Sequence, residues 1–327
     1  MKIPATRKGA SGPVRVGPVM LDPKDVDFGI VEPNTVVKTE VKITNMTDKP
    51  LRIVRSVPSC QCTTVEMAGT VIAPGATVPM PMSMKTSKST GIKAAGVTLV
   101  FEGYQQPVEL SIRSEVAYAV RAVPPFIDVQ QAPHDPQNKP LPPQPLKGTF
   151  TLESIDGKPF RVTGVHGKPP VFVDFDPARD QPRPKYLVAY DFTSTPPAQV
   201  PCYLIVETDR PDCPVMDIRV RHENTRIVPT FKIAEFRSSF GRVEAGAKGE
   251  FDLEVKDLDE VRIASVQSRD PAQAEVRLTS QKPDGKNVLC TFELTPAPGR
   301  TGMLYFPVTL TTTDGRKTDL LVFGRVG

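Results

Sequence analysis

Apolar and polar residues alternate with a period of two along much of the chain. Between residues 37 and 43, valine, threonine and isoleucine alternate with lysine and glutamate, and Phe251, Leu253 and Val255 repeat the pattern further on. Such alternation places one face of a strand against a core and the other face in solvent. Apolar spacing typical of a helix never extends beyond a turn or two. The pattern therefore predicts a chain built almost wholly from β-strands.

Two short motifs recur along the chain. The segment Phe28–Glu32 returns as Phe240–Glu244, with a phenylalanine-glycine pair at the start of each copy. We expect both phenylalanines to pack into a core and both glycines to adopt a backbone that other residues resist. An apolar-arginine-apolar triplet occurs three times, and each copy is followed by a predicted hairpin. The triplets occupy residues 51–53, 160–162 and 261–263, and the hairpins Val97–Val116, Tyr203–Val220 and Leu304–Val326.

These recurrences predict an all-β chain of three tandem immunoglobulin-like β-sandwich domains. About seven short strands per ~100 residues, with turn residues every 8–12 positions, are typical of that fold. The predicted domains span residues 18–120, 121–223 and 224–327, after a basic flexible tail at residues 1–17. The middle domain is the most divergent, and its proline-rich stretch Pro133–Pro145 is expected to form an extended polyproline-type loop.

Composition excludes several classes of protein. Proline makes up 36 of 327 residues, about twice the usual ~5%, which argues against a helical bundle or a doubly wound α/β enzyme. The net charge of +4 is carried by the tail, at Lys2, Arg7, Lys8 and Arg15, and the other 37 basic residues balance the 37 acidic ones. We therefore expect no nucleic-acid partner. No run of 18 apolar residues occurs, so we also expect no membrane span.

The segment Cys60-Gln61-Cys62 is the main candidate for chemistry. Two thiolates could bind a soft metal, Cu(I) above all, with help from the thioethers of Met80, Met82 and Met84. A redox role for paired thiols and a purely structural role are the alternatives, and the methionines also suit one face of a core strand. We expect two separate thiols here, because an extended chain holds Cα atoms two residues apart too far for an easy disulfide.

The other reactive side chains predict no catalytic site. Cys202 and Cys290 fall on apolar strand faces, whereas Cys213 falls in a hairpin loop. We expect the three histidines, His134, His166 and His222, to lie on the solvated surface. The acidic residues Asp174, Asp176 and Asp180 have basic neighbours, which favours a solvated loop over a Ca²⁺ site. No nucleophile, nucleotide-binding or zinc-protease motif occurs, so we predict a protein that is not an enzyme.

The first predicted domain resembles a bacterial immunoglobulin-like domain family of unknown function, related to the Hydin and major-sperm-protein type of β-sandwich. The resemblance covers residues ~22–118 and rests on five blocks. These are Asp27-Phe28-Gly29 with Val31, Val41 to Asn45, Pro50 to Ile53, Ser59-Cys60-Gln61-Cys62-Thr63, and Ile72 to Gly75. The chain departs from the family at Gln61, where the family usually has glycine. The resemblance implies an exported or surface module, and it implies no catalytic activity.

Two functions follow as predictions. The first is a non-enzymatic structural or protein-interaction module of the bacterial cell envelope or surface, with a protein partner. The alternative is a thiol-based copper-binding or redox protein centred on Cys60 and Cys62. The tail has no apolar segment and is not an intact signal peptide. A cytoplasmic protein and an exported protein without its signal both fit, and we favour export to the periplasm or cell surface.

Overall fold

The computed structural model describes residues 12–60, 62–86, 90–223, 230–256, 261–284 and 287–327. Strands dominate the described residues, which contain no α-helix, and a 3-10 turn lies at Pro197–Gln199. This confirms the predicted all-β fold of immunoglobulin-like β-sandwiches. The chain divides into two compact units, residues 1–119 and residues 120–327, and each is considered separately.

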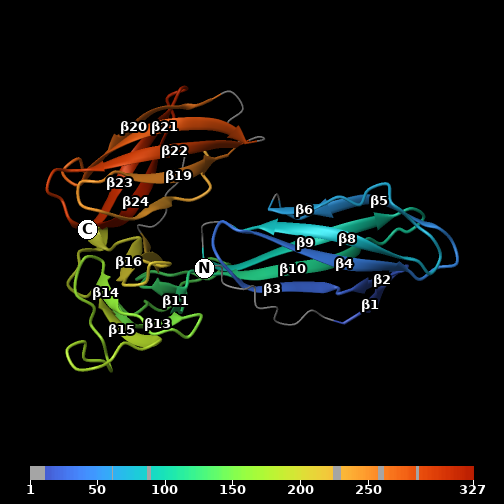
Figure 1. Ribbon diagram of the computed structural model, residues 1–327, viewed down its shortest axis with the longest axis horizontal. Helices are drawn as coiled ribbons and strands as arrows, with labels where there is room; N and C mark the ends of the chain where they lie inside the picture. The colour runs from blue at the N-terminus through green and yellow to red at the C-terminus, as the bar shows by residue number, and fades with distance from the viewer. Residues whose placement is uncertain (1–11, 61, 87–89, 224–229, 257–260, 285–286) are drawn as a thin grey trace. The chain divides into compact units, whose positions relative to one another are not determined.

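The first unit consists of two five-stranded sheets (Figure 1). One sheet has the order β1 (Val14–Val16), β2 (Val19–Asp22), β4 (Val36–Asn45), β8 (Thr77–Lys85) and β6 (Thr63–Val65). The other has the order β3 (Asp25–Val31), β10 (Val108–Val116), β9 (Gly91–Phe101), β5 (Leu51–Pro58) and β7 (Val71–Ile72). The inward residues of both sheets form one core, which includes the fully buried Val41, Ile43 and Leu99. The alternation in the sequence thus marks the buried face of these strands.

The predicted tail at residues 1–17 is partly wrong. Residues 1–11 lie outside the described residues, but Val14–Val16 forms β1 and pairs antiparallel with β2. Gly17, with a φ of 56°, makes the tight turn between the two strands. The alternation of valines with Arg15 is enough to continue the sheet, so the basic residue does not prevent a strand here.

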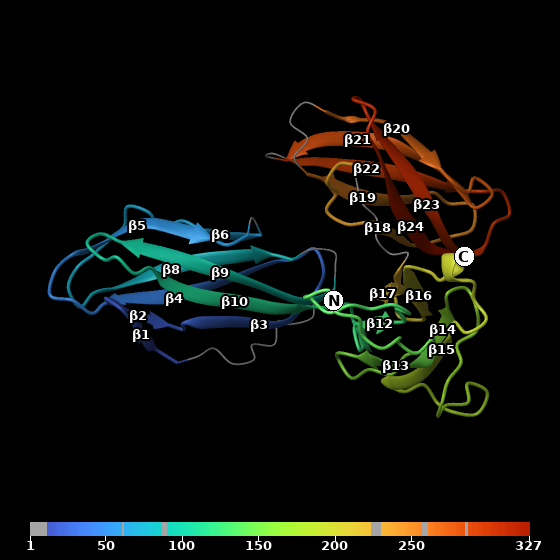
Figure 2. The same cartoon turned by 180° about the vertical axis from the view of Figure 1, so that it is seen from behind.

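The second unit contains four sheets, which fall into two pairs along the chain. The middle sheet pair, residues 120–221, contains β11 (Val120–Val123), β13 (Lys147–Ser154) and β15 (Lys185–Asp191) in one sheet and β12 (Phe126–Asp128), β17 (Val215–Arg221), β16 (Tyr203–Thr208) and β14 (Val162–Val165) in the other. The last sheet pair, residues 237–326, contains β18 (Arg237–Val243), β24 (Lys317–Val326), β23 (Gly302–Thr312) and β20 (Ile263–Ser268) in one sheet and β19 (Gly249–Val255), β22 (Asn287–Pro296) and β21 (Ala274–Asp284) in the other. Figure 2 shows these strands from behind. The predicted boundary near 223 adjoins residues 224–229, which lie outside the described residues, and the count of three domains stays a prediction.

In each sheet pair an early strand runs parallel to the last strand. The pairs are β3 with β10, β12 with β17, and β18 with β24. Phe28 and Phe240 lie where the register shifts in β3 and β18, and both are buried, at 6% and 7% exposure. Gly29 and Gly241 follow them with φ values of 67° and 70°. The predicted equivalence of the two phenylalanine-glycine segments is confirmed.

The three apolar-arginine-apolar triplets share a second irregularity. Each leads into the strand that pairs antiparallel with the first strand of the hairpin, and each is followed at once by a register shift. The shifts come after Ile53 in β5, Val162 in β14 and Ile263 in β20. A bulge at this point bends the strand and increases its twist. The motif seen in the sequence therefore marks one structural feature in all three sheet pairs.

The proline-rich stretch Pro133–Pro145 forms no strand, as predicted, but it is not simply extended. An isolated bridge joins His134 to Pro140, and the Leu141 amide donates to the Pro133 carbonyl at 2.8 Å. A turn at Asp135–Asn138 reverses the chain between them. The stretch folds back on itself because two of its residues other than proline, Asp135 and Asn138, stabilise a turn.

Candidate functional site

The turn that carries Cys60 and Cys62 crosses from β5 in one sheet to β6 in the other. The Ser59 amide donates to the Gly96 carbonyl at 2.9 Å, and the Gly96 amide donates to Ser59 Oγ at 2.8 Å. On the opposite side, the Lys85 amide donates to the Cys62 carbonyl at 2.8 Å. The turn is therefore tied to both sheets of the first unit.

Cys60 and Cys62 are joined by a disulfide, so the prediction of two separate thiols is wrong. Their Cα atoms lie 5.2 Å apart, within the range usual for disulfides. The prediction assumed an extended strand, whereas the chain turns here, and the Thr63 amide donates to the Cys60 carbonyl at 3.3 Å. Gln61, where the sequence departs from the resembled family, lies outside the described residues.

Both half-cystines are half-buried, and both sulfur atoms lie near the hydroxyl group of Thr63. Thr63 Oγ1 lies 3.5 Å from Cys60 Sγ and 3.8 Å from Cys62 Sγ, and Thr63 is itself buried. Within the described part of the chain, no three histidine, cysteine, aspartate or glutamate side chains are grouped to hold a metal ion. Cu(I) would require both thiolates and hence the reduced protein, so copper binding at Cys60 and Cys62 stays a prediction.

The methionines of β8 belong to the core. Met80, Met82 and Met84 are at most 3% exposed, and they lie opposite Val41, Thr39 and Val37 in the register of β4 and β8. Methionine fills such irregular spaces well. Of the two interpretations of this period-two run, the structure supports core packing.

The remaining cysteines behave as lone buried or half-buried thiols. Cys290 is fully buried in the last sheet pair, as predicted, and burial raises its pKa to about 11. Cys213 lies in the turn between β16 and β17 but is also buried, and burial raises its pKa to about 11 as well. Cys202 is half-buried, and burial raises its pKa. None of the three is held as a reactive thiolate.

The acidic loop is solvated and paired with its own basic neighbours. Arg183 Nη2 lies 2.6 Å from Asp174, and Arg179 Nε lies 3.5 Å from Asp176. Asp180 accepts a hydrogen bond from the Asp176 amide instead of facing a shared centre. The prediction of a solvated loop is confirmed.

Sequence reasoning was correct for one of the three histidines. His134 is exposed, but His222 is buried and His166 is half-buried. The His166 ring packs edge-on against Tyr305 of β23, with centroids 4.7 Å apart. Its Nδ1 atom is buried and has no hydrogen-bond partner among the described residues. Strand periodicity around His166 cannot reveal this contact, because Tyr305 comes from the other sheet pair.

Acidification is expected to destabilise the second unit through His166. Burial, with a smaller contribution from Lys168, lowers the pKa of His166 to about 4, against ~6.5 in an unfolded chain. Between about pH 6.5 and pH 4, the unfolded chain binds a proton at this histidine and the folded protein does not. The free energy of unfolding therefore falls as the pH is lowered over that interval. We expect His166→Asn to remove about 2–3 kcal/mol of this loss. Asparagine tolerates the left-handed φ of 50° at this position.

Urea unfolding of the wild type and the variant at pH 7 and pH 4 measures this difference. His134→Asn is the matched control, because His134 is exposed, and it should leave the pH dependence unchanged. If His166→Asn and the wild type lose the same stability on acidification, His166 is not the responsible group.

Buried charges connect the middle and last sheet pairs within the second unit. Arg237 at the start of β18 places Nε 2.5 Å from Asp217 of β17 and Nη1 2.7 Å from Glu235, and all three residues are at most 9% exposed. Burial lowers the pKa of Arg237, but the charges of Asp217 and Glu235 outweigh it, and the net pKa is raised. Its guanidinium carbon also lies 5.1 Å from the ring centre of Tyr203.

An apolar cluster and a second ion pair accompany these charges. Tyr203, Ile205 and Val215 of the middle sheet pair pack with Phe323 of β24, and Arg325 pairs with the buried Glu207. The sequence analysis missed this contact. One signal was available: β16 begins with four consecutive apolar residues, Tyr203 to Val206, and such a run is the pattern of a strand covered on both faces.

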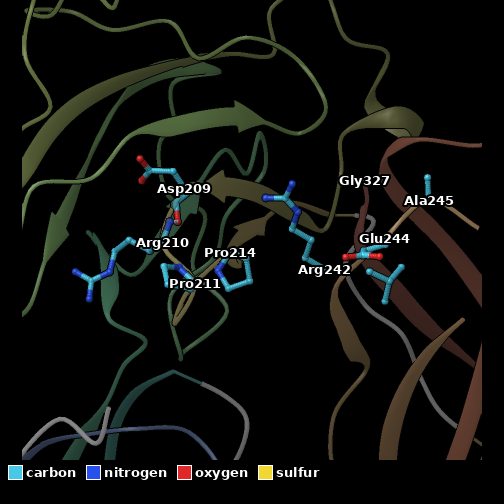
Figure 3. A pocket seen from close by; sticks show the side chains of 10 residues that line it. Asp209, Arg210, Pro211, Pro214, Arg242, Glu244, Ala245 and Gly327 are labelled. Atoms are coloured by element: carbon cyan, nitrogen blue, oxygen red, sulfur yellow. Dashed lines mark hydrogen bonds between the residues drawn. The ribbon is translucent and has the colours of Figure 1, made fainter. Parts of the chain in front are cut away.

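A cavity of about 610 Å³ opens beside this contact, between the turn after β16 and the end of β18 (Figure 3). In Figure 3, Arg210 points away from Arg242, which extends toward the turn at Asp209–Pro214. Arg210 is occupied by ion pairs with Asp156 and Asp212, both at 2.7 Å. The other charged side chains that line the cavity, Asp209, Arg242 and Glu244, are of mixed sign. The lining therefore favours no class of charged ligand.

The comparison with protein families concerns the first unit. Residues 19–116 match DUF1573, a family of proteins of unknown function. The DUF1573 match includes the turn with Cys60 and Cys62 and nearly coincides with the stretch over which the sequence resembles a family of unknown function. The comparison with curated proteins gave no match.

Solved structures with similar parts have low overall similarity. The PapD-like domain 7 of human CEP192 aligns with 10% identity and a TM-score of 0.26 over 34% of this chain and 94% of that domain. The Vibrio cholerae protease VesB aligns with 14% identity and a TM-score of 0.25, over 31% of this chain. A family 123 glycoside hydrolase from Clostridium perfringens aligns with 8% identity and a TM-score of 0.26, over 28% of this chain. The alignment spans 32% of VesB and 22% of the hydrolase. These scores carry no argument about function.

Proposed function

We propose that this chain is a non-enzymatic protein-interaction module of the bacterial cell envelope or surface. We further propose that its partner binds as an extended peptide strand along the segment Val171–Val173. The observation that carries the proposal is a short apolar segment with an open backbone edge in the middle sheet pair. No helix in the described part of the chain is long and apolar enough to cross a bilayer.

The segment Val171–Val173 lies along β15, the edge strand of its sheet. The Val173 amide donates to the Leu187 carbonyl at 3.0 Å, and the Ala189 amide donates to the Val171 carbonyl at 2.8 Å. In an antiparallel ladder the residue between two such bonds points its own amide and carbonyl the other way. Neither group of Phe172 has a hydrogen-bond partner among the described residues. An added strand would supply both partners.

The side chains divide into an anchored set and an exposed set. Phe172 packs against Tyr186 and Phe175, with ring centroids 5.3 and 4.9 Å apart. Val171 and Val173 point outward and are 64% and 55% exposed. β-Branched side chains suit the face of a neighbouring strand. Because the aromatic contacts hold the segment in place, little conformational entropy would be lost in ordering it when a partner binds.

The wider organisation supports a modular binding protein. The parallel strand pairing and the bulge after each triplet recur in all three sheet pairs, which supports three tandem copies of one fold. The resemblance of the first unit to an exported family, including its relation to the Hydin and major-sperm-protein type, supports a place in the envelope.

Acidic substitution of the edge segment is expected to abolish partner binding without unfolding the protein. A photo-crosslinking amino acid placed at position 171 or 173 in cells should capture one and the same protein. Binding of that purified protein should fall at least about tenfold in the Val171→Asp/Val173→Asp variant, because charge on an edge deters strand addition. Circular dichroism and thermal unfolding should be unchanged, because both side chains are exposed.

The matched control is Val36, which is 52% exposed in β4 of the first unit. A crosslinker at Val36 should miss the partner, and Val36→Asp should keep full binding. If the partner binds the doubly substituted variant as well as the wild type, the edge segment is not its site. Fractionation of cells that express the native gene tests the compartment, and protein found only in the cytoplasm contradicts the envelope location.

A further inference from the structure

The Cys60–Cys62 disulfide contributes little to the stability of the fold. In the chain-entropy view, a disulfide stabilises a fold by restricting the unfolded chain, and the effect grows with the length of the closed loop. This one encloses a single intervening residue, so it hardly restricts the unfolded chain. The turn is moreover held by backbone hydrogen bonds from Thr63 to Cys60 and from Lys85 to Cys62. The bond therefore adds little to the stability of the turn.

The surroundings of the two sulfur atoms suit exchange chemistry. Both half-cystines are half-buried, whereas Thr63 beside them is buried. The Thr63 hydroxyl, 3.5 Å from Cys60 Sγ and 3.8 Å from Cys62 Sγ, can donate a hydrogen bond to whichever sulfur becomes a thiolate. Hydrogen bonds to a charged acceptor are stronger than those to a neutral one. Because the turn is tied to both sheets, the two sulfur atoms remain neighbours after reduction.

We propose that Cys60 and Cys62 form a thiol–disulfide exchange site that reacts with an external dithiol. A thiolate of the dithiol attacks one of the two sulfur atoms. The bond between Cys60 and Cys62 breaks as the new one forms, and its electron pair leaves on the other cysteine as a thiolate beside Thr63. The second thiol of the dithiol then attacks the mixed disulfide as a thiolate and releases the remaining cysteine. Two electrons and two protons pass to the protein, and the dithiol becomes a disulfide.

This inference is independent of the partner-binding role proposed for Val171–Val173. It predicts that exchange at this site requires no unfolding. Native protein incubated with dithiothreitol should gain two maleimide-reactive thiols beyond those of the Cys60→Ser/Cys62→Ser variant, which measures the background from Cys202, Cys213 and Cys290. Oxidised dithiothreitol should remove both again. Thermal unfolding of the double variant should be close to that of the wild type.

Thr63 gives the test its second measurement. Thr63→Val keeps the shape of the buried side chain and removes the hydroxyl, so exchange should slow about tenfold and the pKa of the reduced thiols should rise. Thr63→Ser should restore the wild-type rate and pKa. In parallel reactions at equal thiol concentration, dithiothreitol and reduced thioredoxin should reduce the site further than glutathione does. Equal reduction by glutathione would contradict a dithiol as the reactant.

Three outcomes would overturn the proposal. Thiols that become reactive only in denaturant would make the disulfide inaccessible in the folded protein. Loss of most of the thermal stability in the double serine variant would show that the disulfide is needed to hold the fold. Equal reaction of the variant and the wild type with all monothiol and dithiol reagents would place the reactivity at the other cysteines.

Discussion

Asp217→Ala is expected to lower the free energy of unfolding of residues 120–327 by about 3 kcal/mol. Asp217 is 6% exposed and accepts from Arg237 Nε at 2.5 Å. Removal of one partner of a buried ion pair leaves the other charge uncompensated, at a cost of about 3–5 kcal/mol. We expect the lower end of that range because Glu235 still pairs with Arg237. The loss should also loosen the contact between the middle and last sheet pairs.

Simultaneous replacement of all three charged residues should restore stability instead of lowering it. When Asp217, Glu235 and Arg237 are replaced together by leucine, leucine and methionine, no charge remains to be buried. Such replacements are often neutral or stabilising, so the triple variant should recover most of the stability that Asp217→Ala loses. Recovery would show that the charges fix the arrangement of the two sheet pairs more than they stabilise it.

Hydrogen exchange measured by mass spectrometry can locate the effect in the full chain. Protection should fall in β17 and β18 of Asp217→Ala, while peptides from β9 in the first unit serve as an internal reference. Arg269→Ala is the matched control, because its ion pair with Asp319 is exposed and should be worth less than about 1 kcal/mol. Equal effects of Asp217→Ala and Arg269→Ala would contradict a special role for the buried charges.

The sequence predicted those features that depend on one strand and its immediate neighbours. The alternation along β4 and β19 located their buried faces, because the pattern reflects local backbone geometry. The triplets marked the repeat, but the bulges that follow them were not predicted. Features made by two distant segments were missed. The environment of His166 depends on Tyr305, and that of Asp217 depends on Arg237, and no periodicity within one strand encodes the other strand's position.

The sequence identified the two cysteines of the candidate site, but the predicted geometry of the segment that carries them was wrong. Two cysteines two positions apart were visible in the sequence, but their disulfide depends on a turn between β5 and β6. Pro58 and Ser59, just before Cys60, are residues that favour turns, yet the prediction applied the extended distance between alternate Cα atoms to this segment. The local turn, rather than any long-range packing, decides the state of these sulfur atoms.

The two buried phenylalanines lie at matching places and are packed by different neighbours. Phe28 is 6% exposed in the core of the first unit, and Phe240 is 7% exposed in the core of the last sheet pair. The ring of Phe240 occupies space that two glycines leave open. A Cβ atom on Gly324 would lie 2.6 Å from the ring, and one on Gly249 would lie 3.1 Å from it. The ring of Phe240 therefore packs directly against the backbone of these two glycines.

Phe28→Ala and Phe240→Ala should each cost about 3–5 kcal/mol of unfolding free energy. Both substitutions remove a buried ring and leave a cavity, and at Phe240 the glycines have no side chains with which to fill it. Thermal unfolding monitored by calorimetry, with hydrogen exchange to assign each transition, measures the two losses separately.

Phe126 provides the matched control, because it begins β12, the corresponding parallel strand of the middle sheet pair, yet it is 38% exposed. Its ring mainly covers the guanidinium of Arg221, 4.8 Å from the ring centre, so Phe126→Ala should cost less than about 1 kcal/mol. A loss at Phe126 as large as that at Phe28 would mean that the position in the repeat, rather than burial of the ring, determines the energy.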